Sequence, residues 1–489
     1  MVKKLNILFY PGGGLGDSIV SLPVLNALHE YYGSYGQTDV ITGQNIEALR
    51  EIYYGIPFIG DILPCPPGTE LAFGDIYDVV ASANEMVNMQ IKNAAPDLVP
   101  DFMEMLQTHG VARRNKFGII NHVHNVLNNQ LANHAVLLGL DRRSLPLYSM
   151  GLMNYQNTVP SMQLRPRALA TLTTQCLSPR GYITVQDGWD ANFPLKTLDT
   201  RPTKVWSAAA WAALVAELKV LHPDKKIVQL GSPKTGEDII GVDLNLRGKI
   251  NLRDALAILK YAALHIDTEG GLVHMARGLH TRSLVLFGPT NEKFFGYKRN
   301  KNLVPPCTNC WWLTNDWMSD CVRDLAVPEC MTYHTPAAVA NAASISLAQE
   351  TLPRGRVEFA TMPDMQGNIG IANDSALAAQ MAVAGNTVIN FDLFAQKNIQ
   401  RPVPGMNYCQ YLARPSNLPI ENQTLDYLHF TADEDANEFA GEMLEALRVL
   451  KIGGAAVIKN IPQNTDVFIK AGLTPPSGSG DILTLRRTA

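Results

Sequence analysis

A net positive charge, long apolar runs and the pattern of a signal peptide are all missing from this chain of 489 residues. Its 41 lysines and arginines are outnumbered by 45 acidic residues, so the net charge is −4 and the basic surface typical of a nucleic-acid-binding protein is absent. No apolar run approaches the ~20 residues of a membrane-spanning helix. The first apolar segment soon meets Pro11 and four glycines, unlike a signal peptide. These features favour a cytoplasmic protein, with a peripheral location at the inner membrane left open.

Cysteines are few, but four of the seven are clustered. They are Cys307, Cys310, Cys321 and Cys330. In a cytosolic protein, a C-x2-C pair followed by two further cysteines indicates a metal site more than a set of disulfides. Four thiolates suit tetrahedral zinc or a rubredoxin-like iron, and a closed site of this kind is structural. The alternative is a loop in which three tryptophans form a small apolar plug.

The length predicts about three domains. We place them at residues 1–164, 165–348 and 349–489, and the sequence predicts an α/β fold. In the second domain, strands alternate with helices, which implies a doubly wound parallel sheet. The predicted strands there are 182–186, 226–230, 262–266 and 283–287, and the predicted helices are 208–220, 252–261 and 272–277.

Two glycine-rich turns connect a strand to a helix. In the first, Gly13, Gly14 and Gly16 follow the apolar strand 5–10, and Asp17 and Ser18 are candidate N-caps of the next helix. The second reads DTEGGLVHMA from residue 267. Glycines let the backbone approach a bulky anion, and the amides and dipole at a helix start favour that anion. The expected ligand is therefore a nucleoside diphosphate carrying a further group.

Four phrases together resemble glycosyltransferase family nine, the family of the bacterial ADP-heptose transferases. They are GGLGDSIVSLPVLNAL, KVWSAAAWAALVAEL, DTEGGLVHMA and LFGPT, within roughly the first 345 residues. The resemblance implies a GT-B fold, in which two Rossmann-like domains face a cleft. It places the donor diphosphate on the second domain and the acceptor on the first, beside the glycines of the first turn.

One departure from the family pattern lies in the second turn. Family members often read Asp-Ser/Thr-Gly-x-x-His, whereas Glu269 and a second glycine lengthen the turn here. This variant resembles a subgroup related to the protein O-heptosyltransferases, so a lipopolysaccharide acceptor does not follow. In those relatives a cysteine motif holds iron and serves assembly.

The resemblance assigns the catalytic roles to two residues. Asp17 matches the family's catalytic aspartate and becomes the candidate base for the acceptor hydroxyl. Lys204 matches the lysine of the Lys-x-Trp element and becomes the cation that stabilises the leaving diphosphate. The structural alternatives are a helix N-cap for Asp17 and a solvated surface lysine for Lys204.

The other candidates would surround the donor. Backbone amides of Gly270, Gly271 and Leu272 would meet the diphosphate, and His274 would reach a phosphate unless it is structural. The remaining acidic and hydroxyl candidates are Asp187, Asp267, Thr268, Glu269 and Thr290. Asp267 and Thr268 would hold the nucleotide or sugar or cap the helix. Glu269 would bind ribose or sugar hydroxyls, and Thr290 would help a phosphate or simply end a strand.

The last segment resembles a class I methyltransferase. Its closing phrase, residues 448–454, is similar to the late-helix turn of that fold. The expected Gly-x-Gly-x-Gly loop is broken, because Gly370 is followed by side chains that would hinder S-adenosylmethionine. We interpret this domain as degenerate, not expected to bind S-adenosylmethionine, and suited to recognition, scaffolding or oligomer contacts.

The leading hypothesis is an inverting glycosyltransferase without a catalytic metal. Its donor would be a nucleotide-diphosphate sugar, with heptose favoured by the resemblance. Its acceptor would be a glycan, a lipid-linked saccharide or a protein, and a homo-oligomer is compatible with the sequence. One alternative is a bifunctional glycosyltransferase and methyltransferase. The other is a non-catalytic sugar-binding or assembly protein built around the cysteine site.

Overall fold

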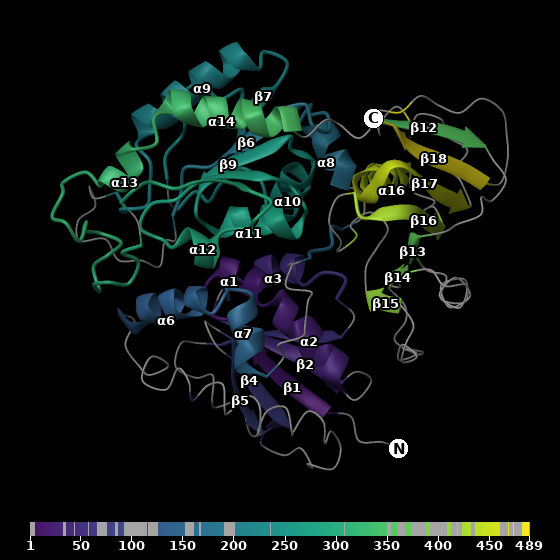
Figure 1. The fold of residues 1–489 in the computed structure, drawn as a ribbon, viewed down its shortest axis with the longest axis horizontal. Coiled ribbons are helices and arrows are strands. Elements are labelled where there is room, and N and C mark those ends of the chain that lie inside the picture. The colour runs from purple at the N-terminus through teal and green to yellow at the C-terminus, as the bar shows by residue number, and fades with distance from the viewer. Residues whose placement is uncertain are drawn as a thin grey trace.

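The structure is a computed structural model with three sheets, each covered by helices (Figure 1). The residues it describes are 5–32, 36–43, 45–56, 58–65, 76–83, 87–91, 115, 126–151, 161–165, 168–189, 201–234, 236–307, 309–349, 354–359, 367–372, 387–391, 408–411, 418, 423–431, 436–459, 468, 473 and 482–488. Within these ranges, no helix combines the length and apolar character needed to cross a bilayer.

The first domain contains a sheet of order β3-β2-β1-β4-β5. Its strands are β1 (Leu5–Tyr10), β2 (Gly36–Thr42), β3 (Ile59–Pro64), β4 (Val79–Ala83) and β5 (Val87–Ile91). All pairs are parallel except β4 with β5. The predicted bounds of β1 are confirmed, because its apolar residues are buried in the centre of the sheet. Three of the helices here are α1 (Leu15–Val20), α2 (Leu22–Tyr32) and α3 (Ile46–Ile52).

The second domain contains an all-parallel sheet of order β11-β10-β9-β6-β7-β8. Its strands are β6 (Tyr182–Val185), β7 (Lys226–Gln229), β8 (Leu244–Asn245), β9 (Leu264–Thr268), β10 (Ser283–Leu286) and β11 (Lys301–Leu303). Figure 1 shows α9 (Ala208–Leu221) and α14 (Pro336–Gln349) over one face, with α10 (Leu252–Tyr261) and α11 (Gly271–Gly278) on the other. The doubly wound prediction is confirmed.

The predicted bounds in this domain are correct for α10 and displaced for β9. The apolar positions of α10 recur with helical spacing, and Asn251 caps its start. The predicted strand 262–266 ended too early, because β9 continues through Asp267 and Thr268. Both polar residues pair with β10, so they belong to the sheet and not to the turn. The next helix starts at Gly271, one residue earlier than predicted.

The two domains face one another across α1 and α3 on one side and α10, α11 and α12 (Glu292–Phe295) on the other (Figure 1). This is the GT-B arrangement that the sequence predicts. Backbone contacts also cross the boundary, since Arg142 donates its amide to the Phe294 carbonyl and Met162 to the Gly278 carbonyl.

The third domain contains a sheet of order β12-β18-β17-β16-β13-β14-β15. Its strands are β12 (Arg354–Phe359), β13 (Asn368–Ala372), β14 (Thr387–Phe391), β15 (Tyr408–Tyr411), β16 (Leu425–Thr431), β17 (Leu450–Lys459) and β18 (Ile482–Thr488). The five strands from β15 to β17 are parallel and follow the Rossmann order 3-2-1-4-5. A third α/β domain is therefore present.

Gly370 does not open the predicted cofactor loop of this domain. Gly370 was expected to open the loop, but it is a buried residue in the middle of β13, paired with Ile389 and Leu428. The residues after the strand, 373–386, lie outside the described part of the chain. The degenerate loop remains a prediction.

A buried ion cluster attaches the third domain to the second. Helix α8 (Ala168–Thr174) packs against both α10 and α16 (Ala436–Val449). Lys260 of α10 donates to Glu445 of α16 at 3.0 Å, and Arg448 donates to both oxygens of the same carboxylate. Burial alone would raise the pKa of Glu445, but Arg448 and Lys260 outweigh it and lower the pKa to about 2. One carboxylate therefore pairs with two buried cations at the interface.

We expect Glu445→Ala to lower the free energy of unfolding by about 3–5 kcal/mol, because it leaves buried cations without their anion. Urea denaturation at neutral pH measures this loss, and the exposed Glu47→Ala serves as the control for removing a paired carboxylate. The folded pKa of Glu445 is depressed, so its contribution is present above its unfolded pKa and is lost as the pH falls toward about 2. The wild type should thus lose more stability than the variant on acidification, and parallel losses would contradict this assignment.

Candidate active site

A cavity of about 710 Å³ lies between the first and second domains. It opens beyond the carboxyl ends of β1, β6, β7 and β9, where ligands bind in doubly wound sheets. Most of the sequence candidates line it. They are Gly14, Gly16, Asp17, Lys204, Asp267, Glu269, Gly270, Gly271, Leu272 and His274. The two glycine-rich turns, far apart in sequence, therefore face the same space.

Asp17 occupies the first turn of α1 and is not its N-cap. The cap is Gly14, and Asp17 is the third helical residue. Its Oδ2 accepts the Gly14 amide at 3.0 Å, which satisfies a backbone group that the helix leaves free. Ser18 is not the cap either, since its hydroxyl donates to the Gly14 carbonyl. The N-cap prediction was wrong for both residues, because the cap lies at Gly14, before both of them in the sequence.

Arg142 holds the other oxygen of Asp17. Its guanidinium donates to Asp17 Oδ1 at 3.0 Å, and its side chain is 5% exposed against 33% for Asp17. A charge-assisted hydrogen bond of this kind fixes the direction of the carboxylate. Arg142 precedes α7 (Ser144–Ser149), and no motif in the sequence marked it. It joins the site only through the fold, 125 residues away from its partner.

Lys204 reaches the cavity from the opposite domain. Its ammonium donates to the Glu269 carbonyl at 3.0 Å and lies 3.7 Å from the Glu269 carboxylate. Burial alone would raise the pKa of Glu269, but Lys204 and His274 outweigh it and lower the pKa to about 2. The cavity therefore contains an ionised carboxylate next to a cation, and a ligand phosphate placed there would share that cation.

The start of α11 supplies the amide groups that the sequence predicted. Gly270 is the cap of this helix, in an extended conformation, and the lining continues through Gly271 and Leu272. The unpaired amides and the dipole of the helix favour an anion at this point. Lys204 and the start of α11 thus place positive potential on the second-domain side.

His274 is fixed by a residue that the sequence did not reveal. Its Nδ1 lies 2.7 Å from the hydroxyl of Tyr297. Tyr297 is buried, and this burial raises the pKa of its hydroxyl to about 12. The Arg143 guanidinium covers the Tyr297 ring at 4.3 Å. A phenol that stays protonated can donate to Nδ1, which leaves the Nε2 proton directed at Glu269, 3.5 Å away.

Four of the sequence candidates do not line the cavity. Gly13 is exposed, and Thr268 and Thr290 are buried. Asp187 is also buried, with its carboxylate accepting two hydrogen bonds from Arg201 at 2.8 and 2.9 Å. The neighbours of Asp187, Gln186 and Gly188, line the cavity in its place.

Asp267 lines the cavity from the end of β9. It is 2% exposed, and burial raises its pKa. Its Oδ2 lies 3.4 Å from His265 Nε2, beneath the Lys204 and Glu269 pair. A carboxyl group in this position is available to a hydroxyl of a bound ligand.

The four clustered cysteines lie in one neighbourhood. Burial is the main cause that raises the pKa of Cys330 to about 12, and the other three thiols add to it. The thiol of Cys307 accepts from the Arg323 guanidinium at 3.5 Å. Among the described residues, however, no group of three or more His, Cys, Asp or Glu is arranged to hold a metal ion. The ligand types suit zinc or iron, and the metal site remains a prediction.

Comparison with known proteins gives a family match for the second domain. Residues 191–324 match the model of Glycosyltransferase family 9 (heptosyltransferase). The chain is a glycosyltransferase. The matched stretch includes Lys204, Glu269 and His274, which the cavity brings together. No protein of curated function matches the chain.

Three solved structures are similar to parts of this glycosyltransferase. The E. coli ADP-heptose LPS heptosyltransferase II is 14% identical, with a TM-score of 0.41 over 71% of this chain and 99% of that one. The iron-containing dodecameric glycosyltransferase TibC of enterotoxigenic E. coli is 14% identical, with a TM-score of 0.43 over 72% and 78%. A Methanosarcina mazei S-adenosylmethionine-dependent methyltransferase is 17% identical, with a TM-score of 0.17 over 23% and 59%.

The contact between α1 and α11 gives a direct test of the site. A Cβ on Gly16 would lie 3.0 Å from His274 Cδ2, which is tighter than most packed contacts and requires His274 or α1 to move by a few tenths of an ångström. We expect Gly16→Ala to shift α1 against α11 and to lower sugar transfer by about tenfold, less than the ~10²-fold cost of a ~1 Å misplacement in a site. Alanine favours a helix more than glycine does, so α1 itself should not weaken.

Gly13→Ala is the matched control, because a Cβ there would meet nothing within 4 Å. Steady-state rates of sugar transfer for Gly16→Ala and Gly13→Ala test whether the contact between α1 and α11 matters for catalysis. Equal losses, or a fully active Gly16→Ala enzyme, would show that the domains do not meet at this contact during turnover.

Proposed function

We propose that this chain is an inverting glycosyltransferase that moves a sugar from a nucleotide-diphosphate donor to an acceptor hydroxyl without a catalytic metal. One observation carries the proposal. The cavity places the Asp17 carboxylate of the first domain opposite the Lys204 ammonium and the start of α11 on the second. A base faces a leaving-group site across a space of substrate size.

The proposed reaction uses these groups in one displacement. The acceptor oxygen forms a bond to the anomeric carbon on the face opposite the diphosphate, while the bond from that carbon to the diphosphate oxygen breaks. Asp17 takes the proton of the acceptor hydroxyl. The electron pair of the broken bond stays on the diphosphate, where Lys204 and the amides of α11 stabilise the negative charge.

Glu269 and Asp267 would bind the donor through its hydroxyl groups. Glu269 is an ionised acceptor, because its pKa is lowered to about 2 by Lys204 and His274 against the opposing effect of burial. His274, with its Nε2 directed at Glu269, lies beside the same position and could donate to a phosphate oxygen. The arrangement gives each part of a nucleotide sugar a partner of suitable chemistry.

The favoured donor is ADP-heptose. The matching family model describes heptosyltransferases, and one similar E. coli structure is an ADP-heptose transferase by name. The acceptor is proposed only as a hydroxyl on a glycan, a lipid-linked saccharide or a protein. The lengthened turn at Glu269 is the sequence feature that sets this chain apart from the lipopolysaccharide enzymes.

We expect Asp17→Asn to lower sugar transfer by about 10²–10⁴-fold, since the amide cannot accept the proton, while the affinity for the nucleotide sugar stays near the wild-type value. We expect Lys204→Met to weaken nucleoside diphosphate binding instead. Rates of transfer and calorimetric Kd values separate the two effects, with the exposed Asp224→Asn as control. Unchanged transfer in Asp17→Asn would contradict the role of Asp17 as the base, whereas a wild type without transfer activity would favour a sugar-binding protein over an enzyme.

We also propose a structural zinc or iron at the four cysteines, on the chemistry of the thiols and their common neighbourhood. If the four thiolates form one site, metal analysis of the purified protein should give about one ion per chain. Cys310→Ser and Cys330→Ser should lose it, and Cys176→Ser, an exposed cysteine elsewhere, should keep it. Wild-type protein without bound metal would leave the cluster as an apolar loop.

A further inference from the structure

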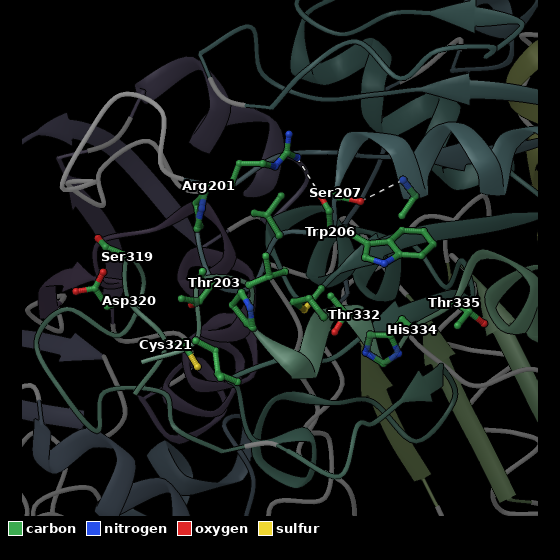
Figure 2. Close-up of a pocket in the computed structure, with 18 of the residues that line it drawn as sticks. Arg201, Thr203, Trp206, Ser207, Ser319, Asp320, Cys321, Thr332, His334 and Thr335 are labelled. Atoms are coloured by element: carbon green, nitrogen blue, oxygen red, sulfur yellow. Dashed lines mark hydrogen bonds between the residues drawn. The ribbon is translucent and has the colours of Figure 1, made fainter. Parts of the chain in front are cut away.

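The segment that carries Lys204 has a cavity on each side. Lys204 lines the cavity between the domains. Its neighbours Thr203, Val205 and Trp206 line a second cavity of about 980 Å³, whose other wall is the cysteine-rich segment and the residues that follow it (Figure 2). The segment 201–206 is therefore a partition between two cavities. Hydrogen bonds to neighbouring segments hold it in position.

The hydrogen bonds of Thr203 attach this partition to the cysteine-rich loop 307–330. The Thr203 amide donates to the Met318 carbonyl at 2.8 Å, and its hydroxyl donates to the Trp317 carbonyl at 2.7 Å. Thr203 is 5% exposed and Trp317 is 2% exposed, so both bonds are shielded from water. Both carbonyls lie between Cys310 and Cys321, in the middle of the loop.

Arg201 anchors the two ends of the same partition to each other. Its guanidinium binds the Asp187 carboxylate and also donates to the Trp206 carbonyl at 3.0 Å. Trp206 in turn packs edge-on against Trp211 of α9. Between these anchors, the Lys204 ammonium contacts Glu269, and the adjacent residue Thr203 contacts the loop.

We infer that Thr203 is a positioning residue, which sets the Lys204 ammonium in the active site by fastening its segment to the cysteine-rich loop. The loop thereby gains a role in catalysis although it does not line the active-site cavity. Removing the hydroxyl would break the buried hydrogen bond to the Trp317 carbonyl and loosen the attachment of the partition to the loop. The inference rests on the proposed function for the catalytic role of Lys204. The position of Lys204 follows from its contacts alone.

A double-mutant cycle tests the link between the two residues. Thr203→Val, which keeps the side-chain shape, should weaken ADP binding by about tenfold through the lost buried bond. Thr203→Ser, which keeps the hydroxyl, should bind like the wild type. In a Lys204→Met background, Thr203→Val should cause no further loss. An equal loss in both backgrounds, or none in Thr203→Val alone, would overturn the inference.

A second measurement reads the position of Lys204 without any nucleotide. Amine labelling followed by mass spectrometry should modify Lys204 slowly in the wild type, where its side chain is 14% exposed and bound to Glu269, and several-fold faster in Thr203→Val. Thr332→Val, on the exposed wall of the second cavity, is the matched control. Thr203→Ala replaces the valine variant if that variant does not fold.

The two measurements fail separately. Unchanged labelling of Lys204 in Thr203→Val and Thr203→Ala would refute the positioning role, whatever the nucleotide result. Faster labelling in a protein whose wild type binds no nucleoside diphosphate would sustain the positioning role and reject the proposed function instead.

Discussion

The account depends on two surfaces that face each other across one cavity, each with a carboxylate paired to a cation. Asp17 and its Arg142 partner come from the first domain, while Lys204, Glu269 and the start of α11 come from the second. Neither half is a site by itself, because a carboxylate at a helix start and a lysine before a helix are common surface features. The close packing of α1 against α11, which leaves little room for a Cβ at Gly16, is what combines them.

The sequence predicted those parts of the fold whose cause is local. The apolar run of β1 and the helical spacing and Asn251 cap of α10 are enough to define both elements. The candidate site also follows in outline, since the turns before α1 and α11 are marked by glycines. Local signals failed where a strand continues into polar residues, as β9 does through Asp267 and Thr268.

Other parts of the site depend on contacts between distant segments. Arg142 and Tyr297 belong to no motif, and each gains its role from a partner that only the tertiary structure supplies. Asp187 shows the opposite case. It stands at the end of a strand, where binding residues are expected, but its carboxylate is taken by Arg201, which holds the segment bearing Lys204. Position on a sheet therefore predicts proximity to a site better than it predicts contact with a ligand.

The three domains also differ in what binds them together. The first two meet through helix packing and a cavity open to substrate, a contact that can adjust as ligands enter. The third is attached through the Lys260, Glu445 and Arg448 cluster, in which one buried carboxylate bonds to two buried cations. Breaking such a cluster is costly, so this domain and the second should move as one body. The cysteine-rich loop lies on the second domain as well, fastened to the segment of Lys204.

Calorimetric titration of the purified wild-type protein with ADP, UDP and GDP is the most direct test of the central claim. A cavity built to stabilise a leaving diphosphate must bind the diphosphate product. The account expects one binding site per chain for at least one of these nucleotides, with ADP the tightest if the donor is ADP-heptose. No binding of any nucleoside diphosphate would contradict the account, because Lys204 and the start of α11 would then have no ligand of the proposed kind.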